Sequence, residues 1–241
     1  MAHRRSATPS EAQSRLRRGR VLLVGVGGLG APAALHLAAA GVGTLGLIDG
    51  DDVELSNLQR QIIYRTADIG RPKVEVAAAR LAATNTQVQV RTFAGRLTAD
   101  NVKRVFAEFD FVIDGTDRIE SKFVVNDGAV AAGTPFSHAG VVGFQAQTFT
   151  VLPRQSACLR CLFPTPPAED DVPTCQTAGV LGALVGTIGM IQAAEAVKYL
   201  SGTGDLLTNR LLTCDAWGAR WRCIDMTKNP RCPLCSGQDV R

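Results

Sequence analysis

The chain has 241 residues, of which 46% are hydrophobic and 20% charged, which fits one large domain with a sizeable core. Its net charge is +4, and six arginines against one acid lie in the first twenty residues, so the remainder is nearly balanced. With only 5% aromatic residues as well, this composition argues against nucleic-acid binding.

The seven cysteines form an odd set, and no apolar signal segment precedes them. Both features favour a reducing compartment, so we expect a cytoplasmic protein. An organelle transit peptide is the alternative, because the N-terminus is rich in arginine and poor in acids. The longest apolar stretch, residues 178–191, is too short to span a bilayer, so we expect no membrane association.

The first part of the chain alternates between predicted strands and helices. Residues 1–19 predict a flexible arm or a short helix. Strands are predicted at residues 21–24, 45–48, 88–93, 111–113 and 135–137, and helices at 29–40, 73–84, 102–109 and 119–132, with short polar helices in 53–68. This order predicts parallel βαβ units, and therefore an α/β fold with a Rossmann-like, doubly wound, mostly parallel sheet.

The pattern changes after about residue 140. Residues 145–152 alternate like an antiparallel strand, and residues 158–177 form a loop rich in proline, cysteine and acids. One helix is predicted over 178–200, where four glycines permit close packing, followed by strands at 211–214 and 222–226. We expect the sheet to continue with antiparallel strands, and Cys214 and Cys223 to be buried within them.

A glycine-rich loop follows the first strand. Its glycines are Gly25, Gly27, Gly28 and Gly30, and a loop placed between a strand and a helix turns backbone N–H groups toward a phosphate. Asp49 follows 19 residues after Gly30, at the end of the next strand, where a carboxylate binds ribose hydroxyls. The sequence therefore predicts a nucleotide site, and the alternative is a turn needed only for packing.

Two basic side chains favour a triphosphate over a dinucleotide at this site. Arg60 and Lys73 fall close to the predicted phosphate loop, in a polar segment that also holds Asp51, Asn57 and Gln61. Substitution at a triphosphate needs cations that neutralise the α-phosphate and the leaving pyrophosphate. The alternative is that both cations are solvated surface charges.

The motif Asp-Gly-Thr-Asp ends the fourth strand of the parallel part. Ligands bind at the carboxyl ends of such strands, and Asp117 could hold Mg²⁺ against phosphate oxygens there. The alternative for Asp117 is helix N-capping, a role that aspartate favours. Asp114 is the rival carboxylate, and we expect it to be structural.

Two Cys-x-x-Cys pairs lie in the last third of the chain, at Cys158/Cys161 and Cys232/Cys235. Four thiolates suit a tetrahedral structural Zn²⁺ site with no open position. The gap of about seventy residues is longer than in a compact zinc finger, so the spacing leaves redox dithiols or unpaired thiols as alternatives.

Eight stretches together resemble the ThiF/MoeB/HesA family, the bacterial relatives of ubiquitin-activating enzymes. They are GVGGLG (25–30), LIDGDDVELSNLQRQ (47–61), GRPKVE (70–75), DGTD (114–117), CLRC (158–161), CQTAGV (175–180), IQAAEAVKYL (191–200) and CPLC (232–235). They cover most of residues 20–236, in order.

The resemblance implies an enzyme that adenylates the C-terminal glycine carboxylate of a small ubiquitin-like sulfur-carrier protein ending in Gly-Gly, with Mg²⁺ and ATP, and releases pyrophosphate. It implies an arm at 1–19 and one domain at 20–241, with an ATP-binding part at about 20–140 and a carrier-binding and zinc part at about 141–241. By position, Gly28 lies against the phosphates, Asp49 holds the ribose, Asn57, Arg60 and Lys73 grip the triphosphate, and Asp117 is the Mg²⁺ ligand.

Further expectations rest on the same resemblance. Cys175 either joins covalently to the carrier or assists sulfur transfer, or it is an inert small residue. A homodimer is expected, and a separate sulfur donor, because no sulfurtransferase domain follows Cys235. The family's N-terminal arginine motif, which reaches the partner's ATP site, has no counterpart here, although Arg4, Arg5 or one of the arginines at 15–18 could substitute. Arg118 stands where relatives have asparagine.

Two other functions stay open on the sequence. One is adenylation of a peptide or other carboxylate in a natural-product pathway. The other is a non-catalytic or NAD-binding Rossmann module, against which Arg60, Lys73 and Asp117 argue.

Overall fold

The fold is taken from a computed structural model, which describes residues 8–93, 95–167 and 178–236. Its strands are β1 (Arg20–Val24), β2 (Thr44–Ile48), β3 (Gln89–Phe93), β4 (Phe111–Asp114), β5 (Phe136–Val142), β6 (Gln145–Val151), β7 (Arg210–Asp215) and β8 (Arg220–Asp225). They form one sheet in the order β3-β2-β1-β4-β5-β6-β7-β8. The pairs among β1 to β5 are parallel and those from β5 to β8 antiparallel, which confirms the predicted fold class.

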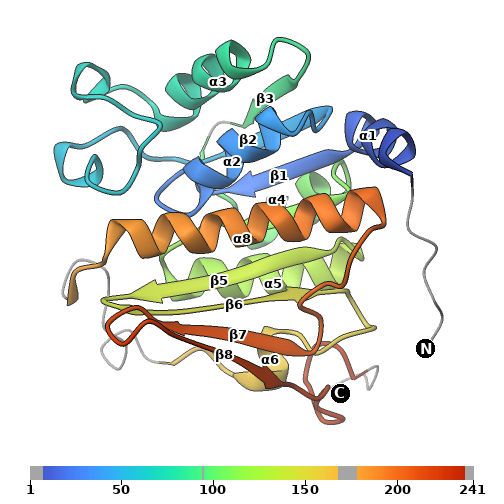
Figure 1. The fold of residues 1–241 in the computed structure, drawn as a ribbon. Coiled ribbons are helices and arrows are strands. Elements are labelled where there is room, and N and C mark those ends of the chain that lie inside the picture. The colour runs from blue at the N-terminus through green and yellow to red at the C-terminus, as the bar shows by residue number, and fades with distance from the viewer. Residues whose placement is uncertain (1–7, 94, 168–177, 237–241) are drawn as a thin grey trace.

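Helices cover both faces of the sheet (Figure 1). They are α1 (Pro9–Arg18), α2 (Gly30–Ala39), α3 (Lys73–Thr84), α4 (Ala99–Phe106), α5 (Ile119–Ala132), α6 (Leu159–Leu162) and α8 (Gly182–Ser201), with short 3₁₀ turns η1 (Leu55–Asn57) and η2 (Thr66–Asp68). One apolar cluster joins the sheet to α2, α3 and α8, and a second joins it to α4, α5 and α6. The molecule is therefore a three-layer sandwich, as a parallel sheet apolar on both faces requires.

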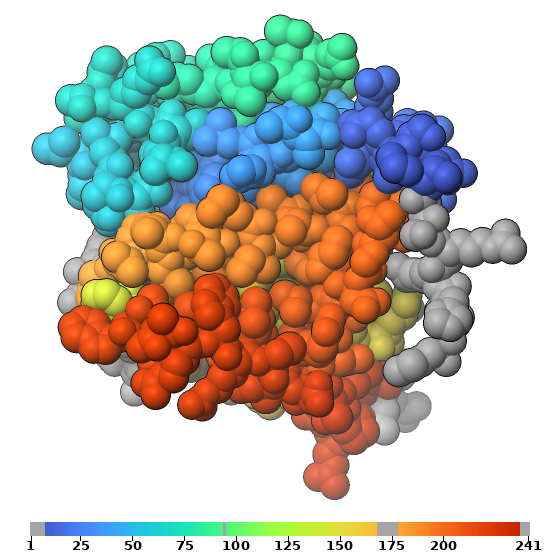
Figure 2. Space-filling model, viewed as in Figure 1, coloured from blue at the N-terminus to red at the C-terminus, as the bar shows by residue number. Residues whose placement is uncertain are grey.

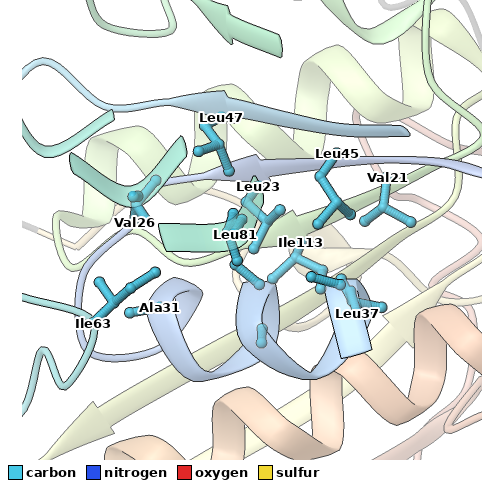
Figure 3. Packing of buried hydrophobic residues seen from close by; sticks show 14 of the residues in the cluster. Val21, Leu23, Val26, Ala31, Leu37, Leu45, Leu47, Ile63, Leu81 and Ile113 are labelled. Atoms are coloured by element: carbon cyan, nitrogen blue, oxygen red, sulfur yellow. The ribbon is translucent and has the colours of Figure 1, made fainter. Parts of the chain in front are cut away.

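Successive residues of β1 belong alternately to the two clusters, because side chains of a strand point to opposite faces of the sheet. Val21 and Leu23 pack against Leu37 of α2 and Leu81 of α3, as Figure 3 shows, whereas Leu22 belongs to the cluster on the opposite face. All five side chains are fully buried. A strand that is buried on both faces is apolar at successive positions, which is why the continuous apolar run predicted a buried strand.

Helix α1 takes the second of the two forms predicted for the N-terminal segment. Thr8 and Glu11 form a capping box, Leu16 is buried, and the Arg15 guanidinium donates to the Ser201 carbonyl at 2.9 Å. The helix lies at the beginning of β1, at the opposite end of the strand from the glycine loop (Figure 1). Arg15 is thus engaged at the C-terminus of α8.

Several element boundaries and one cysteine differ from prediction. Strand β5, predicted at 135–137, runs from Phe136 to Val142, because it pairs with β6 along its whole length. Helix α4 begins at Ala99, earlier than predicted, because Thr98 and Asn101 form a capping box there. Helix α8 begins at Gly182 rather than at 178, because Gly179 has φ +69° and Leu181 donates to the Gly143 carbonyl at the end of β5. Cys214 is buried as predicted, but the prediction for Cys223 is wrong: it is exposed, because β8 is the edge strand.

Within the described ranges, no helix is both long and apolar enough to cross a membrane.

Candidate nucleotide and metal sites

The glycine loop packs too closely for side chains. A Cβ on Gly25, whose φ is +87°, would lie 2.8 Å from the Gly115 carbonyl oxygen, and one on Gly30 would collide with the Gly25 carbonyl. A Cβ on Gly28 would lie 2.7 Å from Val185 Cγ1. The loop is therefore wedged between the β4–α5 turn and α8, with bare backbone at the carboxyl end of β1.

Asp49 lies beside this loop, as the spacing predicted. Its carboxylate accepts hydrogen bonds from the backbone N–H groups of Val26, at 2.8 Å, and Asp51, at 3.0 Å. The pKa of Asp49 is above its ordinary value, because the effect of burial outweighs the opposing effects of Lys73 and of these two N–H groups. The end of β2 is thus fastened to the glycine loop.

Lys73 is only 5% exposed, which rules out the solvated-surface interpretation for this residue. Its Nζ lies 3.3 Å from Asp51 Oδ2, and Arg96 Nη2 lies 2.7 Å from Asp51 Oδ1. Although burial acts to raise it, the charges of Lys73 and Arg96 hold the pKa of Asp51 below its ordinary value. Sequence reasoning missed Arg96, although its place after β3, at the carboxyl end of a parallel strand, is a signal that could have found it.

Asn57 and Gln61 supply two buried acceptors near the glycine loop. Their oxygens, Asn57 Oδ1 and Gln61 Oε1, have no hydrogen-bond partner within the described part of the chain, although both side chains are buried. A Cβ on Gly27 would lie 3.4 Å from Gln61 Nε2, which places this amide against the loop. Buried acceptors normally have donors, so a bound ligand or water is needed here, and a nucleotide carries hydroxyl and amino donors.

Arg60 is half-buried and lies across the same loop. A Cβ on Gly28 would lie 3.3 Å from Arg60 Cγ, and Arg60 Nη1 donates to the Ser56 carbonyl at 3.2 Å. The glycine at position 28 therefore makes room for the arginine stem.

Asp117 and Asp114 differ in burial. Asp117 is exposed and has neither a hydrogen bond nor an ion pair with any described residue. It is not the helix N-cap either, because Arg118 occupies that position in α5 and makes no capping bond. Asp114 is fully buried and bonded to Thr116, Lys122 and His138, which agrees with its expected structural role. Asp117 is the carboxylate left available to a cation.

The four predicted cysteines converge. Their ligand atoms all lie within 4.8 Å of one another, and four of the sulfur–sulfur distances are 3.4–3.9 Å. A tetrahedral ion with Zn–S bonds of about 2.3 Å would hold its sulfurs about 3.8 Å apart. The donor set and spacing therefore fit a four-coordinate metal ion.

Helix α5 contacts the segment that carries Cys158 and Cys161. Asn126 Oδ1 accepts the Leu159 N–H at 2.9 Å, and Arg160 pairs with Asp127 at 2.7 Å while lying 5.0 Å from the Phe123 ring centre. Burial, with the neighbouring Cys161 and Cys232, raises the pKa of the Cys158 thiol to about 12. A cation would offset that cost by stabilising the thiolates.

Some predicted residues cannot be placed. Cys175, Arg4 and Arg5 lie outside the described residues. Sequence reasoning also missed Lys122, His138 and Gln192, which gather behind the Asp117 turn from α5, β5 and α8. No local pattern marks them, because only the fold brings these three elements together.

Residues 3–234 match the ThiF family. The chain is 41% identical to the sulfur carrier protein adenylyltransferase of Thermus thermophilus, with 99% of this chain and 91% of that protein covered. It is 42% identical to the sulfur carrier protein ThiS adenylyltransferase of Escherichia coli, over 95% and 91%. It is 44% identical to the SAMP-activating enzyme E1 of Haloferax volcanii, over 93% and 83%.

Solved structures share the fold. E. coli MccB with ATP superposes with a TM-score of 0.85 at 24% identity, covering 95% of this chain and 70% of that one. PaaA superposes with a TM-score of 0.74 at 27% identity, covering 92% and 68%.

Proposed function

This chain belongs to the ThiF family, and from that premise we propose that it is an adenylyltransferase that activates a small ubiquitin-like sulfur-carrier protein. The relatives named for sulfur-carrier activation are about 40% identical over nearly the whole chain. The observation that carries the proposal is Asp117, whose carboxylate has no partner among the described residues, on a turn that packs against the glycine loop through Gly115.

The reaction is a substitution at phosphorus. An oxygen of the carrier's C-terminal carboxylate attacks the α-phosphorus of ATP, the new C–O–P linkage forms, and the bond to the β-phosphate breaks to release pyrophosphate. The carboxylate is already ionised near neutral pH, so no general base is required. Catalysis then rests on positioning and on neutralising charge.

The chain's own residues supply both the positioning and the neutralisation of charge. The glycine loop presents N–H groups to the phosphates, Asp49 orients the ribose, and Arg60 and Lys73 neutralise phosphate charge. Lys73 reaches the phosphates by leaving or sharing Asp51, which Arg96 keeps paired. Asp117 would hold Mg²⁺, which when bound neutralises the phosphate oxygens.

The cysteine cluster would hold structural Zn²⁺ at Cys158, Cys161, Cys232 and Cys235. A closed site with four thiolates leaves no position for substrate, so its contribution is to fasten residues 232–235 to α6 and α5. The part of the chain from about residue 141 onward, which this site organises, is where we place carrier binding.

We also propose a homodimer that uses α8. Figure 2 shows this helix (orange) running uncovered across one face of the molecule. Met190 is 41% exposed, and a Cβ on Gly186 would meet nothing within 4 Å, so this face can accept a second helix. A cytoplasmic location and a separate sulfur donor remain predictions of this function. Cys175 is predicted either to react with the carrier or to be an inert small residue.

A peptide substrate has less support. MccB structures include complexes with MccA, but at 22–24% identity they show a common fold alone. No described residue of the site favours a peptide over a carrier tail.

The test is ATP–pyrophosphate exchange with purified protein and a panel of carriers ending in Gly-Gly. Exchange should depend on the carrier, and Asp117→Ala should lower its rate about a hundredfold or more, because the metal-binding carboxylate is lost. Asp100→Ala is the matched control, since Asp100 is an exposed aspartate at the start of another helix. Carrier-dependent exchange that survives Asp117→Ala would refute the assignment of this residue.

A further inference from the structure

Lys122 is a lysine withdrawn from solvent behind the Asp117 turn. Its side chain is 12% exposed. Its Nζ donates to the Thr116 carbonyl at 2.6 Å and the Ala139 carbonyl at 2.6 Å, and lies 3.3 Å from Asp114 Oδ2. All three ammonium protons thus have acceptors within the protein, so this lysine is not a surface charge.

Asp114 completes the cluster from the end of β4. Its Oδ1 accepts hydrogen bonds from the Thr116 N–H, at 3.1 Å, and the Thr116 hydroxyl, at 2.6 Å. Its Oδ2 faces Lys122 and His138 Nδ1, the latter at 3.0 Å. Burial lowers the pKa of His138, so its imidazole is neutral and Lys122 is the cation paired with Asp114.

These contacts fix the turn of residues 115–118 from behind. Gln192 of α8 donates to the Asp114 carbonyl at 3.0 Å, and Gly115 packs against the Gly25 carbonyl. Thr116, directly before Asp117, is held at its N–H, its hydroxyl and its carbonyl. Among the described residues, the Asp117 carboxylate has no hydrogen-bond or ion-pair partner, so it is left free while the residue before it is anchored.

We propose that Lys122 is a positioning residue for Mg²⁺ binding: it holds the Thr116 carbonyl and the Asp114 carboxylate so that Asp117 meets the metal in one fixed orientation. The inference rests on the proposed function. It assigns to Lys122 no contact with substrate; its effect on the metal passes through the Asp117 turn.

The test compares Lys122→Met with Lys198→Met. Lys198 is a matched control, because it also donates to a carbonyl, that of Asp205 at 2.7 Å, and pairs with a buried acid, Glu195. Its partners lie near the C-terminus of α8 and not at the turn of residues 115–118. Two readouts are independent of turnover: hydrogen exchange of the amides at 115–118, and binding of Mn²⁺ followed by electron paramagnetic resonance in the presence of ATP.

Lys122→Met should weaken Mn²⁺ binding and raise the half-saturating Mg²⁺ in pyrophosphate exchange, each about tenfold or more. It should also speed amide exchange at 115–118 about tenfold, while metal-free ATP binding stays unchanged. Lys198→Met should change none of these. Wild-type metal affinity and amide protection in Lys122→Met, or an equal change in Lys198→Met, would overturn the proposal.

Two further variants test the proposal if Lys122→Met does not fold. Thr116→Val removes one hydroxyl from the same cluster, and Lys122→Arg keeps the charge but cannot reach all three acceptors in the same geometry. Both should weaken Mn²⁺ binding, and unchanged binding in both would overturn the proposal. If the wild-type protein shows no carrier-dependent exchange, the proposed function fails, whereas the turn's amide exchange still tests the role of Lys122.

Discussion

Asp114 and Asp117 lie three residues apart, and burial gives them opposite roles. Asp114 is fully buried, and although burial acts to raise it, Lys122 and His138 hold its pKa at about 2. Asp117 is exposed and unpartnered among the described residues. The sequence offered both carboxylates at the end of a strand, and only the neighbours from α5 and β5 decide which of them is free for a ligand.

This cluster makes the protein sensitive to acid. The pKa of Asp114 is lowered from 3.8 to about 2, so its stabilisation is complete above about pH 4 and is lost as the pH falls toward 2. Lowering this pKa from 3.8 to about 2 corresponds to about 2.5 kcal/mol of stability. Burial lowers the pKa of His138 below 6.5, so the unfolded chain takes up this proton first and stability begins to fall below pH 6.5.

Urea unfolding between pH 7.5 and 4 should therefore show a falling free energy of unfolding. His138→Gln should flatten the fall below pH 6.5, because the titrating ring is removed. His36→Gln is the control, since this ring belongs to the last turn of α2, away from the cluster. An identical pH profile in wild type and His138→Gln would contradict the assignment.

At the scale of elements, the glycines of α8 separate into two kinds. A Cβ on Gly189 would collide with the Leu29 carbonyl, so this glycine lets α8 approach the start of α2. A Cβ on Gly186 would meet nothing within 4 Å. The spacing of small residues predicted close packing, but it could not show which glycine faces a neighbour within the chain.

Alanine substitutions test this difference. Gly189→Ala should destabilise the protein by about 1–3 kcal/mol, because a backbone carbonyl must move. Gly186→Ala should stabilise the isolated chain by about 1 kcal/mol, through helix propensity. Thermal unfolding measures both, and sedimentation shows whether Gly186→Ala weakens a dimer. A stabilised Gly189→Ala variant would show that the two helices are not in this contact.

At the scale of the molecule, the cysteine cluster joins segments that the sequence separates by about seventy residues. Cys161 lies in α6 and Cys158 is the N-cap of that helix, whereas Cys232 and Cys235 follow the edge strand β8. A metal there closes a long loop, and cross-links of that kind restrict the unfolded chain more as the loop lengthens.

Removing the metal should therefore lower the melting temperature. A loss of about 3 kcal/mol, typical of removing a cross-link, corresponds to about 6–12 °C for a chain of this size. Elemental analysis should give one zinc per chain in the wild type and none in Cys235→Ser. Cys223→Ser is the matched control, since Cys223 is exposed and outside the cluster, and it should keep both metal and melting temperature. Metal-free wild-type protein with an unchanged melting temperature would refute a structural metal.

The sequence by itself determined the alternation of strands and helices, the glycine loop with Asp49, and the two cysteine pairs, because periodicity, turn glycines and short spacings are local signals. Only the tertiary structure decided that Lys73 is buried against Asp51, that Arg118 takes the N-cap, and that Lys122, His138 and Gln192 meet behind Asp117. Burial and long-range hydrogen bonds depend on elements far apart in the chain, and these set which charges are neutralised and which remain free for a ligand.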